Sequence, residues 1–155
     1  MSNFIWRPEE HAWTRESHIA RFMARHRFKS YAELHAASVK DTAWFWDAAM
    51  QDMGVEWFKP YTQVRDASRG FPWTKWFVGG EVNITHNCVD RHVRDGHGAE
   101  VAIHYEPDSG RPADRRVLTF AELKAQVDQC AGALRGLGVG PGDSVGLYAP
   151  MRPET

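Results

Sequence analysis

The sequence predicts an α/β protein, in which a helical, aromatic-rich front precedes the first hairpin, helix and strand of a layered α/β sheet. Two observations predict this. All seven tryptophans of the 155-residue chain lie at or before Trp76. Residues 99–155 instead hold two short apolar strands, an amphipathic helix and a further apolar stretch, in that order. We therefore expect a helical and irregular region over residues 1–98 and the opening of a sheet, left incomplete, over 99–155.

Three helices are expected in the front, because a residue that caps helix starts precedes each of three periodic apolar segments. These residues are Ser17, Ser30 and Asp41. Glu33 follows Ser30 at the spacing of a capping box, and Gly54 is a natural helix end. The expected apolar positions are Ile19, Phe22, Met23 and His26 in the first helix, and Phe45, Ala49 and Met53 in the third.

Residues 60–98 are expected to form extended pieces and turns with little regular structure. The stretch "KPYTQVRDASRGFPW" holds two prolines and a glycine, which interrupt helices and strands.

The second region opens with a predicted hairpin. The apolar stretches "EVAIHYE" (100–106) and "RRVLT" (115–119) flank a turn-forming cluster, "PDSGRPAD".

A helix is expected next, because Thr119 and Glu122 form a capping box and Gly138 supplies a stop. The stretch "SVGLYAP" (144–150) reads as a further strand, which would make a right-handed strand-helix-strand unit. About 50 residues of such a unit are marginal alone, so we expect the chain to be part of something larger or to need a partner. The helix's apolar stripe consists of Phe120, Leu123, Val127, Cys130, Ala131, Leu134 and Leu137.

Composition excludes some classes of function. The net charge is −1, so no basic face for nucleic acid is implied. No apolar run approaches the ~18 residues of a membrane span, and no secretory leader is visible. The two cysteines, Cys88 and Cys130, are expected to be reduced and structural. A cytoplasmic location is the default expectation.

The stretch "PWTKWFVGGEVNITHNCVDRHV" offers two chemical hypotheses. His86, Cys88 and His92 have plausible spacing for zinc, with His97 as a distant fourth ligand. Cys88 beside a histidine could instead be a nucleophile, although proximity in sequence does not give geometry. The competing interpretation, which we prefer, is a buried cysteine in a turn, with Asp90, Arg91 and His92 making local hydrogen bonds and ion pairs.

The glycine-rich "GLGVGPGD" lacks the Lys and Ser/Thr of a phosphate-binding P-loop. It also follows a helix, whereas a phosphate cradle precedes one. A helix stop with a tight turn is the better interpretation. The aromatic residues Trp73, Trp76 and Phe77 favour a hydrophobic belt against a neighbouring domain.

A family resemblance joins these observations. "KWFVGGEVNITHNCVDRHV" is similar to the N-terminal signature of acetyl-CoA-synthetase-like enzymes, W-F-x-G-G-x-x-N-x-x-x-N-C-x-D-R-H. The stretch from Leu118 to Glu154 resembles the first strand-helix-strand of their AMP-binding domain, with Phe120 where tyrosine is frequent. The start, "IWRPEEHAWTRESHIARFM", is more like the acetoacetyl-CoA synthetase branch. The matching signature residues are Trp76, Phe77, Gly79, Gly80, Asn83, Asn87, Cys88, Asp90, Arg91 and His92.

The resemblance implies a parent enzyme that activates a carboxylate with Mg-ATP to an acyl-adenylate and transfers the acyl group to coenzyme A. The family's phosphate loop, ending in Lys-Gly, has no counterpart here. We therefore assign no catalytic, cofactor-binding or metal-binding residue to this chain and expect it to be inactive alone. The signature would be scaffold, with Trp73 and Trp76 as anchors and Gly79-Gly80 as a turn.

The expected partner is the remainder of the catalytic domain or another copy of the chain, through the exposed sheet. Two alternatives stay open. One is an interaction or regulatory module without catalysis, and the other is a metal-binding protein that uses His86, Cys88 and His92.

Overall fold

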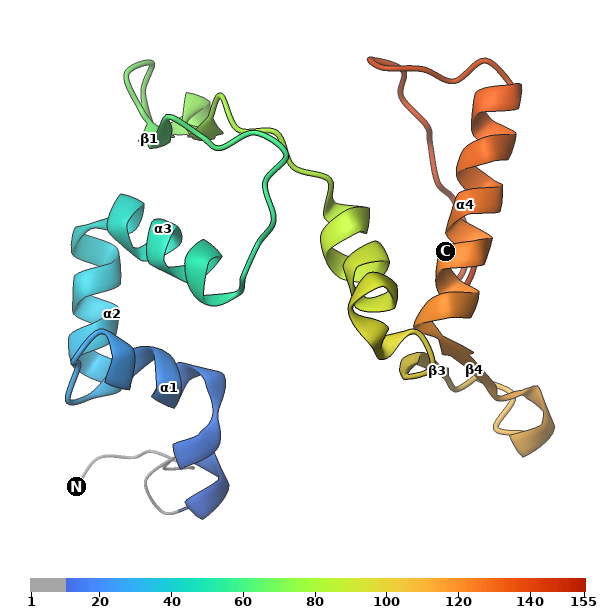
Figure 1. Ribbon diagram of the computed structural model, residues 1–155, viewed down its shortest axis with the longest axis horizontal. Coiled ribbons are helices and arrows are strands. Elements are labelled where there is room, and N and C mark those ends of the chain that lie inside the picture. Colours follow the sequence, from blue (N-terminus) through green and yellow to red (C-terminus); the bar gives the residue numbers. More distant parts are fainter. Residues whose placement is uncertain (1–10) are drawn as a thin grey trace. The chain divides into compact units, whose positions relative to one another are not determined.

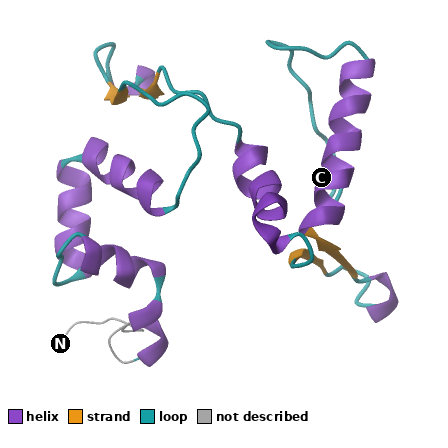
Figure 2. Ribbon diagram, in the orientation of Figure 1, coloured by secondary structure: helices purple, strands orange, loops and turns teal. Residues whose placement is uncertain are grey.

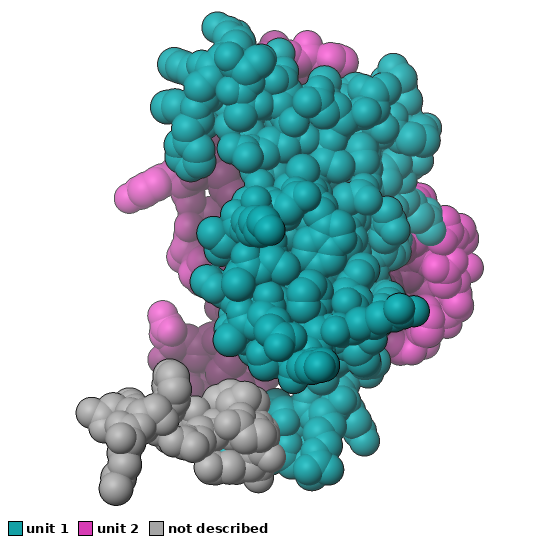
Figure 3. Space-filling view, turned by 90° about the vertical axis from the view of Figure 1, so that its left-hand side faces the viewer, with its two compact units in different colours: residues 1–82 teal, residues 83–155 magenta. Residues whose placement is uncertain are grey.

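The computed structural model describes residues 11–155, which form two compact units. Figure 3 colours the two units, residues 1–82 and residues 83–155. Helices, strands and loops are distinguished in Figure 2. The structure confirms the predicted α/β class, with helices and small antiparallel sheets. The predicted domain boundary between residues 98 and 99 stays a prediction.

The first unit is built on three helices, α1(His18–Arg25), α2(Tyr31–Lys40) and α3(Thr42–Asp52), after a short 3-10 turn, η2(Ala12–Glu16) (Figure 1). All three predicted caps are confirmed. The side chains of Ser17, Ser30 and Asp41 accept hydrogen bonds from backbone N–H groups of the first helical turns, over 3.3, 3.2 and 2.9 Å.

The predicted capping box at Ser30 forms only in half. The carboxylate of Glu33 accepts its hydrogen bond from the backbone N–H of Lys29, at 2.9 Å, one residue before the expected donor. At the far end of α3, Gly54 adopts φ 61°, as expected for a helix stop.

The core of this unit is small and aromatic. Phe22, Leu34 and Ala48, one residue from each helix, are buried. The rings of Phe22 and Phe45 lie edge to face at 6.0 Å between centroids, and Met23, Phe28 and Trp44 also pack on the core.

A β-hairpin follows within the segment expected to contain extended pieces. Strands β1(Gln63–Asp66) and β2(Lys75–Val78) pair antiparallel, with Arg65 opposite Trp76. A one-turn 3-10 helix, η3(Phe71–Trp73), lies in the connecting loop.

The second unit corrects the expectation for residues 84–97, which are helical rather than irregular. Two stretches, η4(His86–Asp90) and η5(Val93–His97), have the wider turns of a π-helix, and the second is interrupted by a kink at Gly96, whose φ is 93°. This segment contacts the long helix of the same unit, and Val89 is buried. Packing of its apolar residues, which the local sequence does not signal, explains the helix.

The predicted hairpin is confirmed as β3(Val101–Tyr105) and β4(Arg116–Thr119), antiparallel, with a one-turn helix, η6(Pro112–Asp114), in its loop. The predicted helix is α4(Phe120–Gly136), and its capping box between Thr119 and Glu122 is complete. Figure 1 shows α4 leaving directly from the end of β4.

The strand predicted over residues 144–150 is wrong, because these residues form no strand and are exposed. A strand needs a neighbour for its backbone N–H and C=O groups, and β3 and β4 pair only with each other. Over residues 11–155, no helix has the length and apolar character needed to cross a membrane.

Candidate functional site

The signature segment, residues 76–92, is divided between the two units, with Trp76–Gly80 in the first and Asn83–His92 in the second. Each half has its own supporting contacts, and the two are described separately.

The first half rests on a cluster of three aromatic rings, Trp57, Tyr61 and Phe77. Their ring centroids lie 4.9, 5.2 and 5.1 Å apart, so each ring contacts both others. Gly80 packs directly on this cluster. A Cβ atom at Gly80 would stand 2.8 Å from Cζ3 of Trp57 and 3.1 Å from Cβ of Tyr61. The close packing of backbone on indole therefore requires glycine at this position.

Gly79 is needed for a different reason. Its φ is +77°, in the region that favours glycine, and the nearest atom to an added Cβ would be Oγ1 of Thr62, at an ordinary 3.4 Å. The predicted Gly79-Gly80 turn is therefore confirmed. Gly79 is needed for its backbone conformation, and Gly80 is needed because a side chain would clash with Trp57.

A polar contact that the sequence reasoning missed fixes the cluster to α3. The Tyr61 hydroxyl donates a hydrogen bond to Oδ1 of Asp47, and Nε2 of Gln51 donates to Oδ2 at 2.9 Å. The bond to the Asp47 carboxylate, with burial and its negative charge, raises the pKa of Tyr61 to about 12. Asp47 and Gln51 lie one helical turn apart, but nothing in the sequence links that turn to Tyr61.

Trp76 contacts α3 and the neighbouring strand β1. Its ring meets that of Trp46 edge to face at 6.4 Å, and the guanidinium carbon of Arg65 lies 5.9 Å from its centroid. Phe71 and Trp73, in the hairpin loop, keep 83% and 66% of their surface exposed. The expected role of Trp73, Trp76 and Phe77 as a hydrophobic belt against a neighbouring domain stays a prediction.

In the second half, two asparagines organise the start of the helical segment. Oδ1 of Asn83 accepts from the backbone N–H of His86 at 3.3 Å. The backbone carbonyl of Asn83 accepts from both the backbone N–H and the side-chain Nδ2 of Asn87, at 3.2 and 3.1 Å. Asn87 is buried, so its amide is used to hold this turn.

The residues of the zinc hypothesis do not form a metal site among the described residues, although the ring centroids of His92 and His97 lie 6.5 Å apart. The ring of His92 stacks on Phe120 at 4.6 Å, and the expected burial of Cys88 is wrong, because its free thiol is exposed. Nδ1 of His97 lies 2.6 Å from a carboxylate oxygen of Glu100, which raises the pKa of His97. Within residues 11–155, no three His, Cys, Asp or Glu side chains are arranged to hold a metal ion.

Asp90, also part of the signature, holds the segment to α4. Its carboxylate lies 2.9 Å from Nζ of Lys124, which reaches Asp128 at the same distance. The hydrogen bonds to Asp128 and Asp90 raise the pKa of Lys124.

The glycine-rich turn after α4 is stabilised by a hydrogen bond within the turn itself. Gly138 and Gly142 adopt φ of 90° and 93°, as a helix stop and tight turn require. The backbone N–H of Gly140 donates to Oδ2 of Asp143 at 2.8 Å. A carboxylate of the chain therefore occupies a donor that a phosphate would need.

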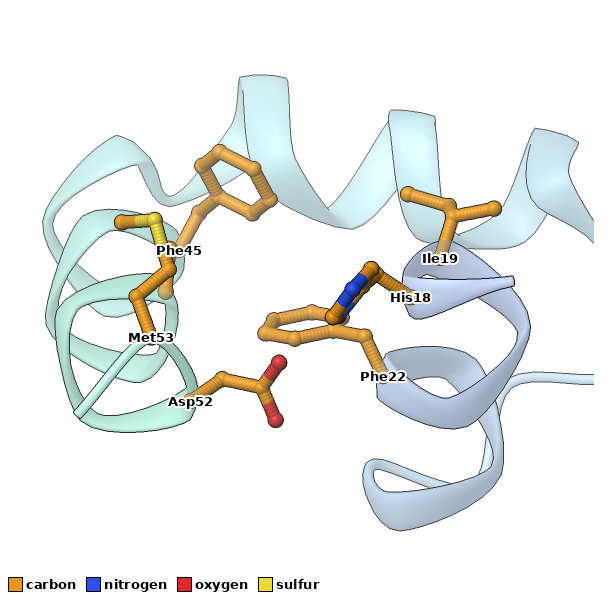
Figure 4. A pocket seen from close by; sticks show the side chains of 7 residues that line it. His18, Ile19, Phe22, Phe45, Asp52 and Met53 are labelled. Atoms are coloured by element: carbon orange, nitrogen blue, oxygen red, sulfur yellow. The ribbon is translucent and has the colours of Figure 1, made fainter. Parts of the chain in front are cut away.

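The first unit has a pocket of about 170 Å³ between α1 and α3 (Figure 4). Its lining is mostly apolar. Asp52 at its rim forms an ion pair with Arg25. The lining residues are His18, Ile19, Phe22, Phe45, Ala49, Asp52 and Met53.

The second unit has a groove of about 520 Å³ along α4. Pro153 and Glu154 form one wall, and Glu154 forms an ion pair with Arg116. The α4 residues that line the groove are Leu123, Gln126, Val127, Cys130, Ala131 and Leu134.

Comparison with known proteins agrees with the signature. The family model described as acetyl-coenzyme A synthetase N-terminus matches residues 31–88, and that of the AMP-binding enzymes matches residues 89–155. An acetyl-coenzyme A synthetase of Mycobacterium tuberculosis is 49% identical over 124 residues. The chain belongs to the acetyl-coenzyme A synthetase family. It corresponds to the N-terminal part of these synthetases.

Two further proteins also match most of this chain. An acetyl-coenzyme A synthetase of Pyrobaculum arsenaticum is 39% identical over 84% of the chain. The acetoacetyl-CoA synthetase structure from Streptomyces lividans matches with a TM-score of 0.67 and 29% identity, over 83% of this chain and 20% of that one. The match to the Mycobacterium tuberculosis synthetase covers 79% of this chain and 18% of that protein. The chain spans 20% of the length of the Pyrobaculum arsenaticum synthetase. The predicted likeness of the start to the acetoacetyl branch falls partly on residues 5–10, outside the described residues.

Proposed function

We propose that this chain is the N-terminal part of an ATP-dependent, AMP-forming, short-chain acyl-CoA synthetase of the cytoplasm. Such an enzyme makes an acyl-adenylate from a carboxylate and passes the acyl group to coenzyme A. The observation that carries the proposal is the order of the two family matches, which meet within the signature at residues 88 and 89.

The chain's own role in this enzyme is structural. The described residues offer no site that fits ATP with magnesium, because no three His, Cys, Asp or Glu side chains among them are arranged to hold a metal ion and Asp143 accepts from the N–H of Gly140 in the glycine turn. What they do is hold a backbone. Trp57, Tyr61 and Gly80 fix one half of the signature, and Asn83 with Asn87 fixes the other half.

The partner of this structural region would be the remainder of the catalytic domain. The exposed rings of Phe71 and Trp73, and the free edges of the β3–β4 hairpin, are surfaces on which such a domain could pack. The chain alone should therefore show no carboxylate-dependent exchange between ATP and pyrophosphate.

A chimera tests the proposal. The region of the Mycobacterium tuberculosis synthetase that matches this chain is replaced by the corresponding residues of this chain, and ATP–pyrophosphate exchange is measured with acetate, propionate and acetoacetate. We expect exchange with at least one carboxylate from the chimera and none from the isolated chain. A well-folded chimera without exchange, or exchange by the isolated chain, would contradict the proposal.

The alternative is an interaction module without catalysis, which the exposed Phe71 and Trp73 would also suit. It predicts a stable monomeric chain and a chimera that folds without activity.

A further inference from the structure

A turn of four residues, 97–100, supports the start of α4. The first backbone N–H groups of a helix have no partner within the helix itself. The capping box serves two of them in α4, those of Thr119 and Glu122. The turn serves the next two, because the carbonyl groups of Glu100 and Gly98 accept from the N–H groups of Phe120 and Ala121, at 3.0 and 2.9 Å.

The ends of this turn are joined twice. The backbone N–H of Glu100 donates to the carbonyl of His97 at 3.0 Å. Nδ1 of the His97 ring lies 2.6 Å from Oε1 of Glu100, so the two side chains join the same two residues. The turn also lies close to its neighbours, since a Cβ atom at Gly98 would stand 3.6 Å from atoms of Ala121 and Val93. A change in the side-chain pair is therefore transmitted directly to the groups that cap α4.

We propose that His97 and Glu100 form a pH-responsive clasp, which closes the 97–100 turn on the start of α4 while the imidazole is protonated and loosens it as the imidazole becomes neutral. A hydrogen bond between two ionised groups is stronger than one with a neutral partner. Neutral imidazole can still donate from Nδ1, so the turn persists above the transition but opens more often. The clasp lies within the second unit and does not depend on the proposed enzymatic function.

The direction of the pH effect follows from the contact. The hydrogen bond to Glu100 and the negative charge of that residue, with a smaller contribution from Asp95, raise the pKa of His97 above its ordinary value of 6.5. A group whose pKa is raised by folding stabilises the fold while it is protonated. The clasp is therefore fully closed below pH 6.5 and is lost as the pH rises through the folded-state pKa of His97.

Other charges around His97 are taken up by contacts of their own. Arg94 pairs with Asp95, at 2.7 Å, and so offsets part of its charge. The ring of His92 lies 6.5 Å from that of His97, and a charge on it would oppose protonation of His97. The other titratable and charged residues from 86 to 96 and in the first two turns of α4 are His86, Asp90, Arg91, Glu122 and Lys124. Of these, Glu122 is bound to Thr119, and Lys124 to Asp90 and Asp128.

NMR titration of the chain from about pH 5.5 to 9 tests the clasp. We expect the His97 ring to titrate with a midpoint above 6.5, and the amide signals of Phe120 and Ala121 to follow the same midpoint. Glu100→Gln keeps the size of the side chain and removes its charge, so the midpoint should fall toward 6.5 and the response of both amides should shrink. Glu106→Gln is the matched control. Its exposed carboxylate pairs with Arg115, and the change should alter neither the midpoint nor the two amides.

Hydrogen exchange separates opening of the turn from a direct effect of charge on the signals. After correction for the intrinsic pH dependence of exchange, the amides of Phe120 and Ala121 should open about two- to five-fold more often at about pH 8.5 than at about pH 6. His97→Gln keeps a donor that does not titrate, so the difference between the two pH values should vanish. Circular dichroism checks that the three variants keep their helix content.

Three results would overturn the proposal. One is a midpoint for His97 at or below 6.5, and another is a pair of amides that does not follow that midpoint. The third is an equal effect of Glu100→Gln and Glu106→Gln. A larger fall of the midpoint in Asp95→Asn than in Glu100→Gln would also contradict it, because the charge acting on His97 would then belong to a residue outside the turn.

Discussion

Gly80 lies under the indole of Trp57 so closely that a Cβ atom there would stand 2.8 Å from Cζ3 of the ring. This contact is shorter than real Cβ contacts allow, so the ring or the backbone would have to move. Gly80 of the signature is therefore required for packing against Trp57 as well as for the turn.

Gly80→Ala should destabilise the first unit by about 1–3 kcal/mol, because the added methyl overpacks the cluster of Trp57, Tyr61 and Phe77. Urea unfolding followed by far-UV circular dichroism measures the change in both units, because the second unit has no tryptophan to report on the control. Gly132→Ala is the matched control. A Cβ at Gly132, within α4, meets nothing within 4 Å, so this change should stabilise the helix by about 0.5–1 kcal/mol. Equal effects at both positions would show that the contact with Trp57 is unimportant.

Tyr61→Phe should cost about 1 kcal/mol or more, since it removes the hydrogen bond to Asp47 and leaves that carboxylate with Gln51 as its remaining hydrogen-bond partner within residues 11–155. The same bond gives the stability a pH dependence. Because the folded-state pKa of about 12 lies above the ordinary tyrosine value of 10, the contribution of Tyr61 is complete below pH 10 and is lost as the pH rises toward 12.

Absorbance titration of tyrosinate, together with melting temperatures from pH 8 upward, measures this dependence. Between pH 10 and 12, the melting temperature of Tyr61→Phe should fall less than that of the unmodified chain, because the variant has no hydroxyl to ionise at this position. Parallel curves for the two proteins would mean that Tyr61 titrates as an ordinary tyrosine. Tyr31→Phe, at an exposed ring on α2, is the control.

Asn87→Asp should destabilise the second unit more at neutral pH than at pH 3. Nδ2 of Asn87 donates to the carbonyl of Asn83, and a buried carboxylate in its place would face that carbonyl oxygen. Protonation of the new carboxyl at low pH restores a donor. Urea unfolding of Asn87→Asp and Asn87→Ala at both pH values separates the charge effect from the lost bond, because the alanine variant should show a similar loss at both.

Thr119→Ala should raise the pKa of Glu122 toward its ordinary value and fray the start of α4. The backbone N–H and the hydroxyl of Thr119 both donate to Glu122 and lower its pKa. A lowered folded-state pKa contributes stability above the unfolded value, and this is lost as the pH falls through the folded one. NMR titration of the Glu122 carboxyl measures the shift. Thr119→Ser keeps the hydroxyl and should keep the lowered pKa.

Local chemistry is what made parts of the fold predictable. Ser17, Asp41 and Thr119 cap helices through atoms only a few residues away, so the sequence alone locates those starts. The β3–β4 hairpin was equally accessible, because apolar stretches flank a turn-forming cluster.

Long-range packing explains what the sequence did not reveal. The helical segment around Val89 is stabilised by α4, more than thirty residues later in the chain, and residues 144–150 lack the strand neighbour that their pattern implies. Within the site, the signature located Gly80 and Asn87 but not their partners. The bond from Tyr61 to Asp47 joins a loop to a helix, and no periodicity reports such a contact.

The wide turns of η4 have a consequence for the order of residues along the signature. Each such turn holds about one residue more than a turn of a regular α-helix, so the residues after it keep the positions that they would have in an α-helix one residue shorter. Removing a single residue between His86 and Asp90 would therefore narrow the turn to a regular α-helical one and leave His92 against Phe120. The wide turn thus tolerates a change in the number of residues in the motif, whereas the side chains that contact α4 must keep their identity.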